Sequence, residues 1–330
     1  MFNWNKPLTR TLVRTILGSF VLSFASVAMA DKIRVAFGDV LNDESLAMAI
    51  AFERAKARGV DYEITYFSKE NLAIQSVING QADIGIGTPY SVIQKSKAPL
   101  RIVFQATRLV FFPVVDKKYK SWKDLDGQPF TFHARGTGTE AIGNIIAKRE
   151  GIKFGDRSYV PGSQNRIVAM MKGQINATII DLANKNILMS KAGDRFHILP
   201  GVSNPASDET VFAKLDFIKK NEAKIDIIVS EFYKLWNEMQ TNPGIIDSER
   251  KKFKMMADQP KEVLAEITSF YKTSTKEGIY SPLGGGEDVA KSDFEFYTEA
   301  GQMTGPISSL KVSDFWYLSP LNKARKAAGK

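Results

Sequence analysis

Segments of strand length alternate with segments of helix length along most of this chain of 330 residues. Strand candidates rich in Ile, Val and Phe fall at 32–37, 62–67, 83–86 and 101–105. Between the first two, Asn42 or Asp43 can cap a helix that runs to Arg58 and ends at Gly59. Because helix-length connections join strands that run in the same direction, this alternation predicts a parallel sheet with helices on both faces.

A second series of the same kind begins after the polar segment 117–126. It contains strand candidates at 129–133, 158–160, 177–180 and 196–199, with helix candidates between them. A chain of this length usually divides into more than one compact unit, so the two series predict two lobes. Val211 and Phe212 could return to the first sheet, and an apolar stripe from Ile225 to Met239 predicts a long helix after them.

The first thirty residues have the three parts of a secretory signal peptide. Lys6, Arg10 and Arg14 precede a largely apolar run, and the small residues at 26–30 form a cleavage site. We therefore expect the mature chain to begin at Asp31. The segment holds three of the 45 basic residues and none of the 36 acidic ones, so its removal lowers the net charge from +9 to +6.

Composition and motifs argue against most kinds of enzyme and metal site. The sequence has no cysteine and two histidines, His133 and His197, which excludes disulfides, thiol catalysis and a histidine-rich metal site. It has no phosphate-binding loop, no Gly-x-Ser-x-Gly elbow and no His-Glu-x-x-His motif. The basic residues are scattered, which does not favour a nucleic-acid partner. We predict no catalytic residue, no metal and no cofactor.

The string Gly136-Thr137-Gly138-Thr139 follows a strand and opens a helix. It satisfies a relaxed dinucleotide pattern, but the acidic residue at the required distance, Asp156, precedes the next strand instead of ending it. A Gly/Thr turn at a helix N-terminus offers free N–H groups, hydroxyls and the positive end of the helix dipole, which favour a small anion. An ordinary Thr-capped helix start explains the same residues equally well.

The order of several short motifs resembles that of periplasmic solute-binding proteins. The run 122–128 (WKDLDGQ) followed by 136–139 resembles their "DLKGK… GSS…" run, and 80–89 (GQADIGIGTP) resembles their "G-x-x-D-I" segment. The most similar group is the aliphatic sulfonate, taurine, nitrate and thiamine-pyrimidine binders of ABC importers, and the resemblance covers most of residues 31–330. Two departures concern the second lobe, where Asn176 stands in place of an acid and 181–184 lacks the usual aromatics.

This resemblance implies an α/β fold of two lobes (type II-like), each a mostly parallel sheet flanked by helices. Two crossing strands near 111–116 and 201–211 would join lobe I (31–113 and 205–330) to lobe II (114–204). It implies a monomeric periplasmic receptor that captures a small organic anion, such as a sulfonate or carboxylate, by lobe closure. The partner would be the membrane permease of an ABC importer.

Two alternatives share this architecture. One is the receptor of a TRAP-type transporter, which sequence alone separates poorly from an ABC receptor. The other is a thiamine-pyrimidine-related binder or enzyme. The yeast pyrimidine synthase of this kind needs a cysteine-rich motif and works inside the cell, so the missing cysteines and the N-terminal segment count against it.

Candidate binding residues follow from the rule that ligands bind beyond the carboxyl ends of strands in open α/β sheets. Arg108 or Arg135 could clamp an anionic group in a bidentate manner. Asp181 would repel an anion, so it either binds an amine or caps the next helix. The full predicted set is Gly38, Asp39, Thr88, Pro89, Tyr90, Arg108, Arg135, Gly136, Thr137, Gly138, Thr139 and Asp181.

Overall fold

A computed structural model describes residues 32–202 and 206–330 of the chain. The predicted signal peptide at 1–30 and the predicted mature start at Asp31 lie outside the described residues. Within the described ranges, no helix combines the length and the apolar character that crossing a membrane requires.

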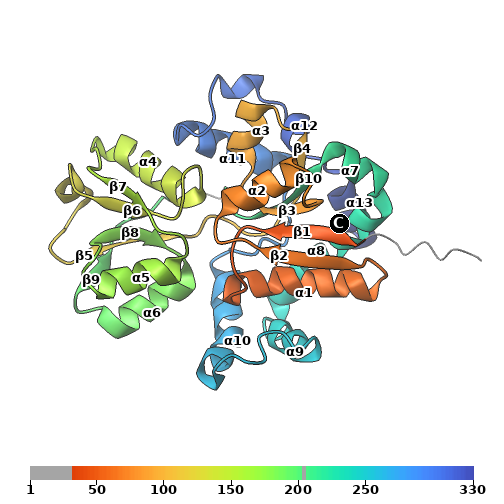
Figure 1. The fold of residues 1–330 in the computed structure, drawn as a ribbon, viewed down its shortest axis with the longest axis horizontal. Coiled ribbons are helices and arrows are strands. Elements are labelled where there is room, and N and C mark those ends of the chain that lie inside the picture. Colours follow the sequence, from red (N-terminus) through yellow and green to blue (C-terminus); the bar gives the residue numbers. More distant parts are fainter. Residues whose placement is uncertain (1–31, 203–205) are drawn as a thin grey trace, which may run out of the picture. The chain divides into compact units, whose positions relative to one another are not determined.

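The predicted two-lobe α/β architecture is confirmed, and each lobe is built on a sheet of five strands (Figure 1). In the first sheet, Val35 lies opposite Ile64 on one side and Ile84 on the other, so β1 runs parallel to both of its neighbours, β2 and β3. The strand order of this sheet is β2 (Tyr62–Tyr66), β1 (Ile33–Phe37), β3 (Ile84–Gly87), β10 (Thr210–Lys214) and β4 (Leu100–Gln105).

The second sheet repeats this arrangement. Two of its parallel strands pair where Thr131 lies opposite Thr178. The Thr178 hydroxyl also donates a hydrogen bond of 2.8 Å to the Thr131 carbonyl. The strand order is β7 (Arg157–Tyr159), β6 (Phe130–Phe132), β8 (Ala177–Ile180), β5 (Phe112–Asp116) and β9 (Phe196–Ile198).

One strand of each sheet is antiparallel to its neighbours, and in each case it is the strand that follows a crossing between the lobes. β10 returns to the first sheet between β3 and β4, as Val211 and Phe212 predict. The first crossing lies directly before the predicted range 111–116, because β5 is already paired between β8 and β9 with Val114 and Val115 fully buried. The residue boundaries of the two lobes stay a prediction.

The first crossing segment is 106–111, and the second is 206–209, directly before β10. They pair with each other: the Leu109 N–H donates to the Ala206 carbonyl at 2.9 Å, and the Asp208 N–H donates to the Thr107 carbonyl at 3.0 Å. The two connections therefore run side by side between the sheets, which gives the lobes a common hinge.

Helices cover both faces of each sheet, as the alternation of elements predicts (Figure 1). The helices that come before the return to the first sheet are α1 (Asp43–Ala57), α2 (Glu70–Ile78), α3 (Tyr90–Ser96), α4 (Gly138–Glu150), α5 (Ser163–Met171) and α6 (Leu182–Ala192), with the 3-10 turn η1 (Trp122–Leu125). Those that follow are α7 (Leu215–Lys220), α8 (Glu222–Thr241), α9 (Ile245–Lys252), α10 (Lys261–Lys276), α11 (Glu287–Glu299), α12 (Val312–Phe315) and α13 (Ser319–Ala327), with the turn η2 (Ile307–Ser309).

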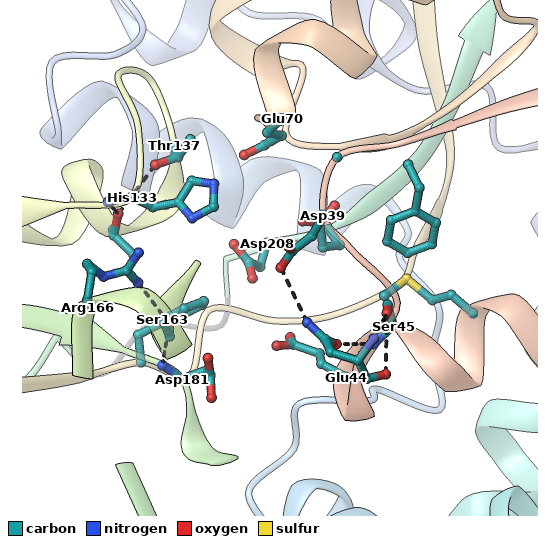
Figure 2. A pocket seen from close by; sticks show the side chains of 18 residues that line it. Asp39, Glu44, Ser45, Glu70, His133, Thr137, Ser163, Arg166, Asp181 and Asp208 are labelled. Carbon is teal, nitrogen blue, oxygen red and sulfur yellow. Dashed lines mark hydrogen bonds between the residues drawn. The ribbon is translucent and has the colours of Figure 1, made fainter. Parts of the chain in front are cut away.

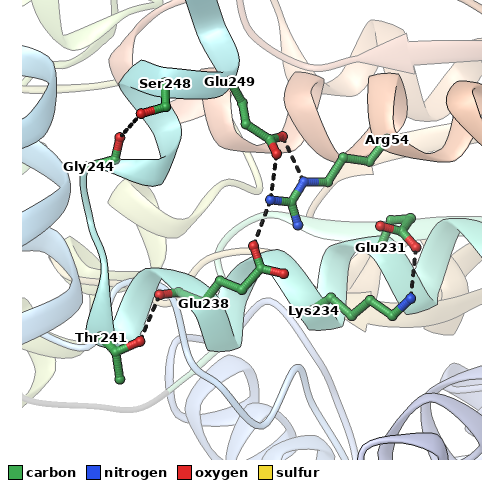
Figure 3. Close-up of polar contacts among 8 residues, drawn as sticks. All are labelled: Arg54, Glu231, Lys234, Glu238, Thr241, Gly244, Ser248 and Glu249. Atoms are coloured by element: carbon green, nitrogen blue, oxygen red, sulfur yellow. Dashed lines mark hydrogen bonds and ion pairs between the residues drawn. The ribbon is translucent and has the colours of Figure 1, made fainter. Parts of the chain in front are cut away.

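The long helix α8 carries the predicted apolar stripe into the core of the first lobe. Phe232 and Trp236 on this stripe are fully buried, and the Trp236 indole N–H donates to the Ala106 carbonyl at 2.7 Å. On its polar side, α8 is linked to α1 and α9 because Arg54 binds both Glu238 and Glu249, each at 2.7 Å (Figure 3).

Candidate functional site

A pocket lies where the carboxyl ends of β1, β6 and β8 and the second crossing segment meet (Figure 2). The space among its lining residues amounts to about 610 Å³, open solvent at the mouth included. The residues that line it come from both sheets and from the hinge: Phe37, Gly38, Asp39, Asn42, Glu44, Ser45, Met48, Glu70, Phe111, His133, Thr137, Gly138, Thr139, Ser163, Arg166, Asp181, Asp208 and Glu209.

Half of the predicted binding residues line this pocket. They follow the strands that the sequence analysis identifies: two after β1, three at the start of α4, and one after β8. These are Gly38, Asp39, Thr137, Gly138, Thr139 and Asp181. The structure brings all six together, although the first and the last, Gly38 and Asp181, lie 143 residues apart in sequence.

Three further predicted residues lie behind the pocket wall or at its edge. The Thr88 hydroxyl donates to the Asp208 carbonyl at 2.6 Å, and the Thr88 N–H donates to the Glu70 carboxylate, so Thr88 supports two pocket residues from behind. Pro89 caps α3, and the buried Tyr90 hydroxyl donates to Asp293. None of the three lines the pocket within the described chain.

The two arginines predicted as anion clamps do not line the pocket either. Arg108 donates to the Gly278 carbonyl at 3.3 Å, and the exposed Arg135 lies over the ring of Tyr159 at 4.9 Å. Gly136 uses its N–H to bind the Glu140 carboxylate at 2.7 Å, which closes the turn in front of α4. These placements correct the prediction, because Arg108, Arg135 and Gly136 each contact a residue that does not line the pocket.

The arginine of the pocket is Arg166 on α5, a residue 1% exposed. Its guanidinium donates to the Val160 carbonyl at 2.8 Å, to the Ser163 hydroxyl at 2.8 Å and to the Ile179 carbonyl at 3.0 Å. Burial lowers the pKa of Arg166 to about 10, and the nearby carboxylates of Asp181 and Asp39 oppose that shift. Arg166 therefore stays charged at neutral pH, with its two terminal nitrogens bound to its own lobe and its Nε buried without a partner among the described residues.

Carboxylates dominate the pocket. Three come from the first sheet and its helices, two from the hinge and one from the second sheet: Asp39, Glu44, Glu70, Asp208, Glu209 and Asp181. Asp181 also accepts the Asn184 N–H at 2.8 Å, so it caps α6 as one of its two predicted roles requires. Against these six acids, Arg166 is the one basic side chain among the described lining residues that carries a charge at neutral pH.

Crowding and burial make these acids hard to ionise. Burial raises the pKa of Asp208 well above its ordinary value, and Glu70 and Asp181 raise it further. Burial likewise raises the pKa of Glu209 and of Glu44 well above the ordinary range, with neighbouring acids adding to the effect. The pKa values of Glu70 and Asp39 are also raised by burial, although hydrogen bonds from Thr88 and Val40 reduce the shifts.

His133 faces the same pocket as a neutral ring. Burial lowers its pKa to about 3, and the charge of Arg166 acts in the same direction. Its Nδ1 accepts the Gly162 N–H at 3.2 Å, which leaves the proton on Nε2 as a donor. His133 thus offers a hydrogen bond without a charge.

The Gly/Thr turn uses its hydroxyls within the turn. The Thr137 hydroxyl donates to the Ala134 carbonyl at 2.8 Å, and the Thr139 hydroxyl accepts the His133 N–H at 3.0 Å. Both threonines are buried, and they hold the start of α4 against the end of β6. Thr137 is the N-cap residue of α4, but its side chain makes no capping hydrogen bond, so these contacts do not decide between a Thr-capped helix start and an anion site.

Several pocket residues escape the sequence analysis. Arg166 and Glu70 lie on the buried faces of α5 and α2, at spacings of one and two turns from Met170 and Val77, so a charge on an apolar face was the available signal. Asp208 and Glu209 follow a Gly/Pro/Ser connection, where no periodicity exists to mark them. Within the described residues, no group of three His, Asp or Glu side chains is placed to hold a metal ion.

Several solved structures resemble this chain, although no curated protein sequence matches it. A protein of Bordetella bronchiseptica RB50 has a solved structure with a TM-score of 0.71 and 18% identity, covering 91% of this chain and 98% of that one. A putative sulfonate ABC transporter, periplasmic sulfonate-binding protein SsuA from Methylobacillus flagellatus KT, gives 0.63 and 18%, covering 91% and 95%. The periplasmic nitrate-binding protein NrtA from Synechocystis PCC 6803 gives 0.66 and 11%, covering 90% and 88%.

These structures share the fold of this chain. A sequence match carries the assignment further, because the profile of the family described as NMT1/THI5 like matches residues 55–244. That match extends over more than half of the chain, which therefore belongs to the NMT1/THI5-like family.

Proposed function

We propose that this chain is an extracytoplasmic solute receptor that binds a small molecule between its lobes and delivers it to an ABC importer. The observation that carries the proposal is the pocket itself, since its wall is drawn from both sheets and from the hinge. A solute in contact with all three parts favours one relative position of the lobes over others.

The names of the structural neighbours support an importer as the partner. SsuA and NrtA are described as periplasmic binding proteins for sulfonate and nitrate, and SsuA as part of an ABC transporter. Periplasmic location and a removed signal peptide are part of the same proposal. A TRAP-type partner has no observation in its favour.

The hydroxyls of the pocket support binding over catalysis. The Ser163 hydroxyl is engaged by Arg166 and by the Asp181 N–H, and the Ser45 hydroxyl donates to the Val40 carbonyl at 3.0 Å. Neither is paired with His133, so the pairing of nucleophile and base that acyl transfer needs is not formed by these groups.

We propose a different solute class from the small organic anion that the sequence analysis predicts. A sulfonate or carboxylate would enter a pocket with six acidic side chains and one arginine, so each remaining negative charge would oppose it. The sequence analysis points to an anion through Arg108, Arg135 and the Gly/Thr turn, and these groups are engaged elsewhere or within the turn.

A solute screen tests the receptor proposal. The mature chain is heated with small amines, amino acids, sulfonates and pyrimidines, and each stabilising compound is then recovered and analysed by mass spectrometry. A bound solute at one hundred times its dissociation constant adds about 2.7 kcal/mol to the free energy of unfolding. We expect at least one compound to stabilise the protein and to be recovered unchanged, whereas conversion into a product would overturn the proposal.

A further inference from the structure

Five of the six acids of the pocket form two groups that differ in whether a positive charge lies beside them. Asp39 and Asp181 lie near Arg166, and their negative charges act on its guanidinium. Glu70, Asp208 and Glu209 form the second group, in which burial is the main reason that each pKa is raised and neighbouring acids add to the effect. No arginine or lysine among the described lining residues lies in this second group.

Asp208 is the central member of the second group. Its residue is 8% exposed, it lines the pocket, and Figure 2 shows its carboxylate among the side chains that surround the space. Its backbone is held on both sides, by Thr107 and by the Thr88 hydroxyl. In residues 32–202 and 206–330, no group donates a hydrogen bond to its side chain.

The neighbours of Asp208 differ in how far their oxygens are satisfied. The Oε2 atom of Glu209 is buried and has no hydrogen-bond partner among the described residues. Glu70 receives the Thr88 N–H on Oε1, which leaves its second oxygen available. Buried carboxylate oxygens without donors are costly, so a protein retains them where a ligand supplies the donors.

Arg166 does not offset this second group. Three of its N–H bonds go to its own lobe, and its charge is balanced by Asp39 and Asp181. An anion placed at Arg166 would still leave the Glu70, Asp208 and Glu209 group without a cation.

We propose that the solute is an organic cation and that its protonated amine binds Asp208, with Glu70 and Glu209 nearby in the same acidic group. This inference rests on the proposed receptor function and names the class of solute. An ammonium group carries a positive charge and three N–H donors, which suits Asp208, a carboxylate that accepts no hydrogen bond from the described residues. A metal ion fits less well, because the described acids are not grouped for metal coordination.

The rest of the pocket suits the body of such a molecule. Phe37, Met48 and Phe111 offer apolar contact to a hydrocarbon chain, and a ring face can also attract a cation. Since Asp208 and Glu209 lie on the hinge while Glu70 lies on the first lobe, the cation would join the hinge to that lobe.

Isothermal titration calorimetry of the mature chain at pH 7.5 and constant ionic strength tests the inference. The probes are 1,4-diaminobutane and butylamine as cations and 1-butanesulfonate as the anion of the same chain length. We expect at least one of the two amines to bind at one site and the sulfonate not to bind. Asp208→Asn keeps the size of the side chain and should weaken amine binding about tenfold to a hundredfold.

Asp258→Asn is the matched control, because Asp258 is exposed and lies outside the pocket. It should bind the amine as the wild type does, and Glu209→Gln should weaken binding if Asp208→Asn does not fold. Binding of the sulfonate in place of the amines overturns the cation inference and leaves the receptor proposal intact. Failure of both amines to bind, or amine binding unchanged in both pocket variants, also overturns it, whereas turnover of a bound solute overturns the receptor proposal instead.

Discussion

Ionisation of Asp208 creates a charge that the fold itself does not neutralise. Its carboxyl is buried beside Glu70 and Glu209, and the raised pKa reflects the cost of ionising it there. A residue of this kind lowers the stability of the empty protein and contributes to binding, which is a common relation between stability and function. Asparagine at this position should therefore stabilise the empty protein while it weakens solute binding.

The gain in stability of the empty protein from Asp208→Asn should depend on pH. Because the folded-state pKa of Asp208 is raised, its contribution to stability is fully present below the unfolded value and is lost as pH rises through the folded value. The variant lacks that loss, so its melting temperature should exceed that of the wild type by more at pH 8 than at pH 5. Relief of about 1 kcal/mol corresponds to roughly 2–4 °C.

Differential scanning fluorimetry of both proteins without solute, from pH 5 to pH 8, measures this difference. Asp258→Asn serves as the control and should track the wild type across the range. A lower melting temperature for Asp208→Asn at pH 8 would show that the carboxylate is stabilising and that a donor satisfies it.

At the scale of single residues, the sequence predicts which positions line the pocket better than it predicts what their side chains contact. Gly38, Asp39 and Asp181 follow predicted strands, so the rule for strand ends places them in the pocket. Arg108 and Arg135 also lie near strand ends, but side-chain direction and local partners decide where an arginine points, and neither is visible in sequence spacing. Asp208 reaches the pocket only because two distant segments pair at the hinge.

Elements of this fold are strongly determined by local sequence. The Gly-Gln turns after α2 and α5 are alike: Gly80 and Gly173 both have positive φ, 74° and 72°, and each ends a helix just before a buried strand. A left-handed residue of this kind favours glycine, which explains the likeness of the two segments. Most predicted strands and helices are confirmed, because periodicity and caps specify them one element at a time.

Strand order is where local sequence is insufficient. β5 reads as a connection, since it follows a run of aromatic residues and contains Pro113, yet it occupies an interior position in the second sheet. Its place depends on β8 and β9, which lie more than 60 residues further along by their numbers. Pairing over that distance leaves no local pattern.

Helix α8 offers a test of how the core supports the hinge. The Trp236 indole donates to the carbonyl of Ala106, at the start of the first crossing segment, so Trp236→Phe leaves a buried carbonyl without its donor. We expect the free energy of unfolding to fall by about 1–3 kcal/mol for the lost hydrogen bond, in addition to the effect of the smaller ring.

Denaturant unfolding of Trp236→Phe measures this loss. Tyr317→Phe is the matched control, since it removes an exposed hydrogen bond from Tyr317 to Glu222 and should change stability by far less. Equal losses in the two variants would mean that the Ala106 carbonyl gains nothing from Trp236.

The whole molecule places an acidic pocket at the meeting point of two lobes and their hinge. Mutual repulsion among acids from different parts opposes their approach, and a cation between them removes that opposition. Solute binding and lobe closure would then have one physical cause. The fold alone does not predict the sign of the solute's charge, because structural neighbours described as sulfonate- and nitrate-binding have the same fold.

Small-angle X-ray scattering of the mature chain with saturating 1,4-diaminobutane tests this account most directly. We predict that the radius of gyration decreases when the diamine is added to the wild type. It should stay unchanged in Asp208→Asn at the same concentration, and in the wild type with 1-butanesulfonate. A radius that is unaffected by the diamine, or that decreases equally with the sulfonate, would contradict the claim that a cation closes the two lobes.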